Sequence, residues 1–276
     1  MKPVILKVAR SRAGGEKQYD TFTIDPVPGM TVLSALFEVQ ARYDNAPAFR
    51  YSCRGAACGT CAMLINRIPR LACRTQLAAL VEGKLDLRLS HYTLPELTGT
   101  WDMKNEVIIE PLPNLPVIRD LIVDMSTFFE HYRDIVPVFT PGDPDPARER
   151  PMTPDAVREL GKYTTCILCG ACYAACPVNG KNKHYPGPAA LAKLFRFHID
   201  PREKEGAARL ATADRPDGWW ACEFHTNCRM VCPKGVPPDK AIGQARQELN
   251  RMRKDKKGDR NGKTGTSAAG DTGGRR

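Results

Sequence analysis

Eleven cysteines, arranged in three runs, constrain this chain more than any other feature of its sequence. The runs are Cys53-x4-Cys58-x2-Cys61 with Cys73 further on, Cys166-x2-Cys169-x2-Cys172-x3-Cys176-Pro177, and Cys222-x5-Cys228-x3-Cys232-Pro233. The count is odd, and the first residues contain no apolar signal core, so no secretion signal is expected. Both observations favour metal ligation over a framework of disulfides.

The first run has the spacing of a plant-type 2Fe–2S site. Three thiolates on one short loop reach two irons only if the backbone wraps around them. Gly55 and Gly59 permit the tight turns and close backbone approach that this needs. A structural zinc site with four cysteines is the alternative. Zinc sites favour paired Cys-x2-Cys units, of which this run has only one, so the cluster is the preferred interpretation.

The second run is typical of bacterial ferredoxins, in which the fourth cysteine binds the other cluster of a pair. The third run matches it at three cysteines and has His225 in place of a counterpart to Cys169. This crossing rule predicts one site with four thiolates for a 4Fe–4S cluster and one with three for a 3Fe–4S cluster. The four are Cys166, Cys169, Cys172 and Cys232, and the three are Cys176, Cys222 and Cys228.

The chain carries a net charge of +10, to which residues 254–276 contribute seven basic and three acidic side chains. The remaining charge forms no dense run, and no aromatic-rich basic stretch is present, so nucleic-acid binding is not expected. An anionic membrane face or an acidic partner would also suit a basic protein. No stretch approaches the ~18 consecutive apolar residues of a membrane span.

Apolar periodicity predicts strands in the first part of the chain and helices later. The expected strands are Val4–Val8, Tyr19–Ile24, Met63–Ile65 and Leu85–Leu89. The expected helices run from Thr31 to about Tyr43, over 118–132, from Thr153 onward, and from Pro237 to about Met252. We therefore expect an α+β chain. Its parts would be a 2Fe–2S ferredoxin-like domain over 1–105, a linker with a connecting helix over 106–152, a helical domain with the 4Fe–4S and 3Fe–4S clusters over 153–253, and a disordered basic tail over 254–276.

Six segments together resemble the iron–sulfur subunit of succinate dehydrogenase and fumarate reductase, the complex II family. They are Ser52–Met63, Leu71–Cys73, Pro116–Met125, Cys166–Pro177, Gly187–Ala190 and Cys228–Gly235. The resemblance covers about residues 1 to 252. It implies an N-terminal β-grasp domain of the plant-ferredoxin type, followed by an α-helical domain like a bacterial ferredoxin.

The same resemblance implies that the chain relays electrons and converts no substrate alone. An FAD-containing flavoprotein subunit would interconvert succinate and fumarate, and a membrane anchor would hold the quinone. Electrons would pass from flavin through the 2Fe–2S, 4Fe–4S and 3Fe–4S clusters to quinone, or in reverse. The chain would then be a peripheral subunit on the cytoplasmic face of a bacterial inner membrane.

The chain departs from the family near the expected quinone site, where many members have an aromatic pair and this sequence has Val178–Lys181. The residues here that could contact quinone are Pro177, Lys181, Trp220, His225 and Arg246. His225 has three possible roles: a filler of the vacant cluster corner, which we prefer, a fourth iron ligand, or a proton donor to quinone. The other histidines, His91, His131, His184 and His198, are expected to be ordinary surface or helix residues.

Two rival functions stay open at this point. One is the iron–sulfur subunit of a soluble fumarate or disulfide reductase, although such subunits typically carry further cysteine-rich modules and this chain ends in a cysteine-free tail. The other is a free ferredoxin-like carrier that forms no stable complex.

Overall fold

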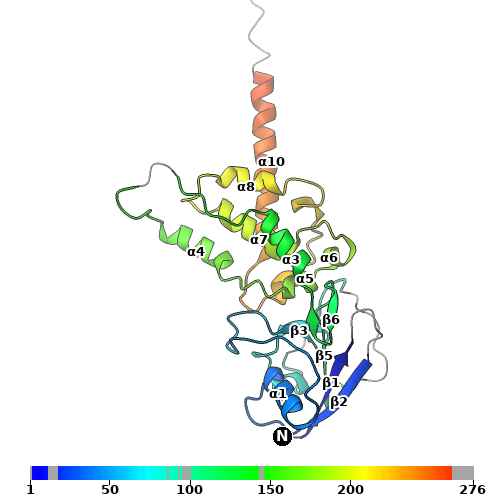
Figure 1. Cartoon of the computed structure of the whole chain (residues 1–276). Helices are drawn as coiled ribbons and strands as arrows, with labels where there is room; N and C mark the ends of the chain where they lie inside the picture. Colours follow the sequence, from blue (N-terminus) through cyan, green and yellow to red (C-terminus); the bar gives the residue numbers. More distant parts are fainter. Residues whose placement is uncertain are drawn as a thin grey trace, which may run out of the picture.

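The computed structural model describes residues 2–11, 18–85, 87–92, 94, 101–142 and 146–262, with side chains up to residue 255. A sheet occupies one end of the molecule and a group of helices the other, as Figure 1 shows. The last helix, α10 (Pro238–Gly262), begins among these helices and its far end extends beyond them. The chain is therefore of the mixed helix-and-sheet class that the sequence predicts.

Five strands form the main sheet, in the order β2-β1-β5-β3-β4. Their bounds are Val4–Arg10 for β1, Gln18–Ile24 for β2, Ala62–Ile65 for β3, Ile68–Leu71 for β4 and Glu106–Glu110 for β5. β1 runs antiparallel to β2 and parallel to β5, and β3 runs antiparallel to β5 and β4. The sheet therefore extends past residue 105, because β5 lies between β1 and β3.

Helix α1 (Val32–Arg42) packs its apolar side against this sheet, and a short helix, α2 (Leu77–Val81), follows β4. Thr31 caps α1 as the sequence predicts, because its Oγ1 accepts a hydrogen bond from the Ser34 N–H at 3.1 Å. The predicted strand at Leu85–Leu89 is wrong: its described residues form no strand. Leu85, Leu87 and Leu89 alternate with polar residues as in a half-buried strand, but no neighbouring strand pairs with this segment in the described part of the chain.

The predicted helix over 118–132 is also wrong at its first half. Residues Val117–Arg119 (β6) and Ile122–Val123 (β7) instead form an antiparallel pair, and the helix α3 begins only at Ser126 and ends at Asp134. Asp120 takes a positive φ of 47° in the turn between these strands, which a continuous helix does not allow. Apolar spacing alone did not reveal that turn.

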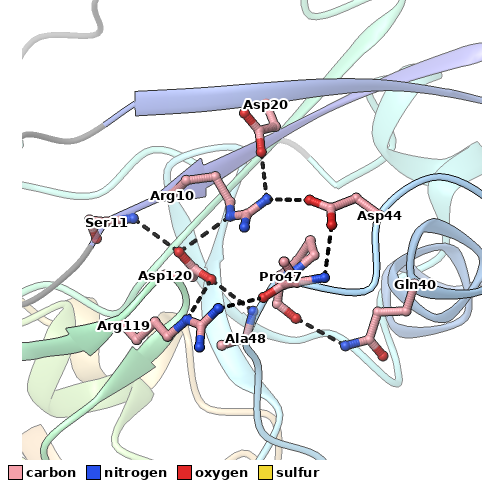
Figure 2. Close-up of polar contacts among 10 residues, drawn as sticks. Arg10, Ser11, Asp20, Gln40, Asp44, Pro47, Ala48, Arg119 and Asp120 are labelled. Carbon is pink, nitrogen blue, oxygen red and sulfur yellow. Dashed lines mark hydrogen bonds and ion pairs between the residues drawn. The ribbon is translucent and has the colours of Figure 1, made fainter.

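The Asp120 carboxylate explains why the turn is stable. Its two oxygens accept hydrogen bonds from the N–H groups of Ser11, at 3.1 Å, and Ala48, at 2.9 Å, and it lies beside Arg10 (Figure 2). Arg10 also pairs with Asp20 and Asp44. One buried carboxylate thus ties the hairpin to the end of β1 and to the loop before the first cysteine run.

The second half of the described chain is helical. Its elements are α4 (Pro154–Thr164), α5 (Ala171–Ala174), α6 (Pro177–Lys181), α7 (Gly187–His198), α8 (Gly206–Thr212), the 3₁₀ turn η1 (Trp219–Ala221), α9 (Asn227–Met230) and α10. Thr153 caps α4 as predicted, accepting from the Ala156 N–H at 3.2 Å. The buried helix α7 is central, and α3 packs on the same half through Phe128 and Tyr173, whose ring centroids lie 5.6 Å apart.

Helix α10 continues to Gly262, beyond the predicted end near Met252 and into the segment expected to be disordered. Lysine and arginine, which are frequent between residues 251 and 257, favour helix almost as well as alanine does. The rest of that segment, 263–276, lies outside the described residues. Among the described helices, none is both long and apolar enough to cross a membrane.

Candidate metal centres

The first site consists of the four cysteines of the first run, and its loop folds around one sulfur. The Cys53 Sγ accepts hydrogen bonds from the N–H groups of Gly55 (3.4 Å), Ala57 (3.3 Å) and Cys58 (3.3 Å). Gly59 has a φ of +78°, as its glycine suggests. Gly55, by contrast, has no positive φ. Its two neighbours, Arg54 and Ala56, take the left-handed conformation instead, both at φ 55°.

The thiols of the first site differ sharply in their surroundings. Cys58 receives a hydrogen bond from Thr60, whose Oγ1 lies 3.1 Å from its Sγ, and one from the Cys53 N–H; together they lower the pKa of the Cys58 thiol to about 6. Cys61 is buried, which raises the pKa of its thiol to about 12, and its thiol contacts that of Cys73. One edge of the site is therefore exposed and already anionic, and the other is inside the core.

The second site is assembled from two runs. The thiols of the first three cysteines of the second run lie next to Cys232, and all four line one apolar cavity; they are Cys166, Cys169, Cys172 and Cys232. Leu168 and Gly170 take positive φ values of 53° and 78°, which turn the loop so that its sulfurs share one side. The backbone N–H of Ala171 donates to Cys169.

The third site holds Cys176, Cys222 and Cys228, whose thiols face one another. Each receives at least one backbone N–H: Cys222 from Phe224 at 3.4 Å, Cys176 from residues at the start of α6, and Cys228 from Asp239 at the start of α10. Burial raises the pKa of the Cys176 thiol to about 11. Such a thiol ionises only if a cation compensates its charge.

These sites fit iron–sulfur clusters. All eleven cysteines are free thiols, and soft thiolates with backbone N–H donors are the usual ligands of such clusters.

The loops of neighbouring sites lie in contact. A Cβ placed on Gly59 would lie 2.8 Å from the Cβ of Cys169 and 3.0 Å from the carbonyl oxygen of Ile167. On the other side, the Cys172 thiol of the second site lies near the Cys228 thiol of the third. The three sites thus follow one another along the molecule.

Arg246 and Trp220, both expected near quinone, meet beside the third site. The Arg246 guanidinium donates to the carbonyl oxygens of Trp219 (2.7 Å) and Cys222 (2.8 Å). It lies 5.4 Å from the Trp220 ring centroid and 4.7 Å from that of Phe224. Sequence reasoning missed Phe224, which is 42% exposed, although its position two residues after a ligand was a usable signal.

The other expected residues take different positions. His225 turns to Glu223, with its Nε2 2.8 Å from a carboxylate oxygen, and its ring centroid lies 4.6 Å from that of His91. His91 was expected to be ordinary, and nothing local in the sequence predicts this contact. Pro177 begins α6 directly after Cys176, and Lys181 is exposed in the last turn of that helix.

Comparisons with known proteins identify two iron–sulfur domains in the chain. A family model described as a 2Fe–2S iron–sulfur cluster binding domain matches residues 4–130, and a 4Fe–4S dicluster domain matches residues 162–236. Helical and sheet parts together resemble a chain of the Mycobacterium smegmatis Sdh1 complex in the apo form, with a TM-score of 0.76 at 24% identity over 91% of this chain and 96% of that one.

Curated relatives extend over most of the chain. The fumarate reductase iron–sulfur subunit of Haemophilus influenzae is 33% identical over 84% of this chain and 87% of its own length. That of Mycobacterium tuberculosis is 34% identical over 88% and 91%, and the succinate dehydrogenase iron–sulfur subunit of Paracoccus denitrificans is 31% identical over 86% and 83%. The chain therefore belongs to the family of iron–sulfur subunits of fumarate reductase and succinate dehydrogenase.

Proposed function

We propose that this chain carries electrons between a flavoprotein subunit and membrane quinone, as the iron–sulfur subunit of a succinate:quinone or quinol:fumarate oxidoreductase. The observation that carries the proposal is the row of three adjoining thiol sites, exposed at the first and flanked at the third by an aromatic and cationic surface. Substrate conversion would belong to the flavoprotein.

The cysteines of the three sites would hold a 2Fe–2S, a 4Fe–4S and a 3Fe–4S cluster, in that order. When bound, these clusters supply one-electron redox chemistry. Two features favour a three-iron cluster at the third site: three thiols meet there, and His225, which replaces the fourth cysteine of the repeat, is paired with Glu223. We prefer this reading to iron ligation by His225.

The protein would contribute by holding the sites close together and largely away from water. Gly59 lets the first loop reach the backbone of the second, since any side chain there would occupy the space of Cys169. The second and third sites share the short helix α5, which carries Cys172 and ends just before Cys176. Close approach of this kind shortens the path for an electron between sites.

The two ends of the row suggest the two partners. Around the first site, Tyr51 is 46% exposed and Arg54 lies against its ring, at 5.7 Å from the centroid. This face would receive the FAD-containing flavoprotein. At the other end, Arg246, Trp220 and Phe224 would face quinone and the membrane anchor, on the cytoplasmic side of a bacterial inner membrane.

In detail, we assign quinone contact first to Arg246 and Trp220. Pro177, Lys181 and His225 remain candidates on their sequence positions around the third site. We also propose that the chain comprises two units, a β-grasp unit of the plant-ferredoxin type and a helical unit like a bacterial ferredoxin. The first would include β5, and hence more than residues 1–105.

The test is purification of the protein from detergent-solubilised membranes of the cells that produce it. We expect co-elution with both partners at a constant ratio, and reduction of quinone by succinate. Elution as a single 30.6 kDa species would support a free carrier instead. Elution with a flavoprotein but no membrane subunit would support a reductase that does not use quinone.

A further inference from the structure

We propose that Arg74 forms a charged bridge between the first and second sites, and that its charge stabilises an electron on either of them. The inference rests on the proposed function of these sites as cluster centres. Arg74 would be a positioning and tuning residue, because it is no ligand and acts on both sites through space.

The bridge is one hydrogen bond between residues that adjoin the ligands of two different sites. The Arg74 Nη1 donates to the carbonyl oxygen of Pro233 at 2.9 Å, across 159 residues of sequence. Arg74 directly follows Cys73 of the first site, and Pro233 directly follows Cys232 of the second. The guanidinium therefore lies where the ends of two cysteine runs meet.

Both ends of the bridge belong to turns that are closed by their own hydrogen bonds. On the first side, the Arg74 N–H and the Thr75 hydroxyl donate to the Leu71 carbonyl oxygen, at 3.1 Å and 2.9 Å. On the second side, the Gly235 N–H donates to the Cys232 carbonyl oxygen at 3.2 Å. The positions of these turns limit the movement of the guanidinium relative to both sites.

Arg74 also lines a groove between the sheet and the helices. Most of the other side chains that line this groove are apolar, among them Ile68, Leu87 and Met230, and Cys232 lies at the same groove. A charge beside apolar side chains is screened less than a charge surrounded by water. Arg74 is nevertheless exposed, so water and salt reduce the strength of its field.

The charge of Arg74 is not neutralised by a neighbour. In the described part of the chain, no carboxylate forms an ion pair with Arg74, whereas Arg67 lies 3.0 Å from the buried carboxylate of Glu110. An electron that arrives at a cluster adds a negative charge, which a nearby unpaired cation stabilises. Arg74 would therefore raise the reduction potentials of the first and second clusters.

The variant that isolates the charge is Arg74→Gln, which is neutral and can still donate to a carbonyl oxygen. We expect a fall of about threefold in the reduced-to-oxidised ratio of both clusters at a fixed ambient potential, which is a fall of about 28 mV for a one-electron couple. Arg74→Lys keeps the charge and should restore both potentials.

Arg119→Gln is the matched control. Arg119 is also exposed, and its guanidinium also donates to a backbone carbonyl oxygen, that of Ala46 at 3.2 Å. It differs from Arg74 in two respects: its Nε lies 3.7 Å from a carboxylate oxygen of Asp120, and it adjoins no cysteine. The same substitution here should leave both potentials unchanged.

The experiment is redox potentiometry of the purified complex, with the EPR signals of the first and second clusters as the readout, at low and at high salt. Lower potentials of both clusters in Arg74→Gln, restored in Arg74→Lys, support the proposal. The difference should shrink at high salt, because salt screens a charge but does not reverse a change in geometry. Unchanged potentials in Arg74→Gln, a fall at one cluster alone, an equal fall in Arg74→Lys, or a fall that salt does not alter would each overturn it.

A second variant keeps the proposal testable if Arg74→Gln loses a cluster. Arg74→Met also removes the charge but keeps a long apolar side chain at the groove, and unchanged potentials in this variant would overturn the proposal. Absence of the signal of either cluster in the unaltered complex would instead refute the proposed function of that site.

Discussion

Asn227 and Ser90, which are 137 residues apart, exchange two hydrogen bonds that join the N-terminal part of the chain to the third site. The Ser90 N–H donates to the Asn227 side-chain oxygen at 2.9 Å, and the Asn227 amide donates to the Ser90 carbonyl oxygen at 2.8 Å. The same amide reaches the Ala175 carbonyl oxygen at 3.1 Å. Asn227 is 1% exposed and precedes the ligand Cys228, so it fixes this ligand against both neighbours.

Replacing Asn227 by alanine should therefore weaken the third site more than the first. We expect the loss of these buried bonds to cost about 1–3 kcal/mol of stability. This loss of stability can be measured by heating the protein and following its EPR signals. The third-site signal should disappear at a lower temperature than in the unaltered protein, and the 2Fe–2S signal should change little. Asn105→Ala, at an exposed position, is the control. Equal loss of both signals would contradict the prediction.

Gly59→Ala should slow electron transfer between the first and second sites. Its positive φ costs a residue with a side chain about 1–2 kcal/mol, and the new methyl group would push the loop away from Cys169. Rapid-freeze EPR after succinate addition should show the first cluster reduced before the others. The control is Gly55→Ala, where the nearest atom to the new Cβ lies at 3.7 Å. Equal rates in the two variants would exclude a role for this contact.

Cys58 should be the most reactive thiol of the first site in protein stripped of its clusters. Hydrogen bonds from Thr60 and from the Cys53 N–H lower its pKa to about 6, so it is mainly thiolate above that pH, whereas Cys61 stays protonated up to about 12. Alkylation with iodoacetamide at pH 7 to 8, followed by peptide mass spectrometry, should label Cys58 first. Thr60→Val removes the hydroxyl and should slow that labelling by raising the Cys58 pKa. Preferential labelling of Cys61 would contradict this order.

Arg246→Gln should reduce quinone turnover while sparing electron flow to an artificial dye that accepts electrons from the flavoprotein side. The substitution removes the charge that lies between Trp220 and Phe224, and it weakens the hold on the carbonyl oxygen of Cys222. We expect a loss of at least about tenfold in quinone reduction, equivalent to about 1.4 kcal/mol. Arg253→Gln is the control, since Arg253 also lies over Trp220, at 5.0 Å, but pairs with Asp214 on the exposed side. Equal losses in both variants would point to folding rather than quinone contact.

The sequence predicted correctly those features that depend on residues close together in the chain. Helix starts at Thr31 and Thr153 follow from capping chemistry, and both are confirmed. The family resemblance, which depends on short cysteine-rich segments, is confirmed by relatives over most of the chain. The predicted division of the cysteines among three clusters stays a prediction, which rests on the pairing rule that the ferredoxin repeat carries within its spacing.

Features that depend on distant residues were not predictable. The apolar spacing of residues 118–132 suits a helix, but Asp120 is held in a turn by groups more than seventy residues away. The contact between the rings of His91 and His225 was also not predictable, because it joins residues that are far apart in the sequence. The left-handed positions of Arg54 and Ala56 are imposed by the folded loop, not by local preference, since glycine at 55 was the natural candidate.

The most direct test of the central claim is the cluster inventory of the purified protein, by iron and sulfide analysis together with EPR. We predict about nine irons per chain, shared among one 2Fe–2S, one 4Fe–4S and one 3Fe–4S cluster, and a 3Fe–4S signal in the oxidised protein. Zinc in place of a cluster, or a third site that holds four irons with His225 as a ligand, would contradict the account.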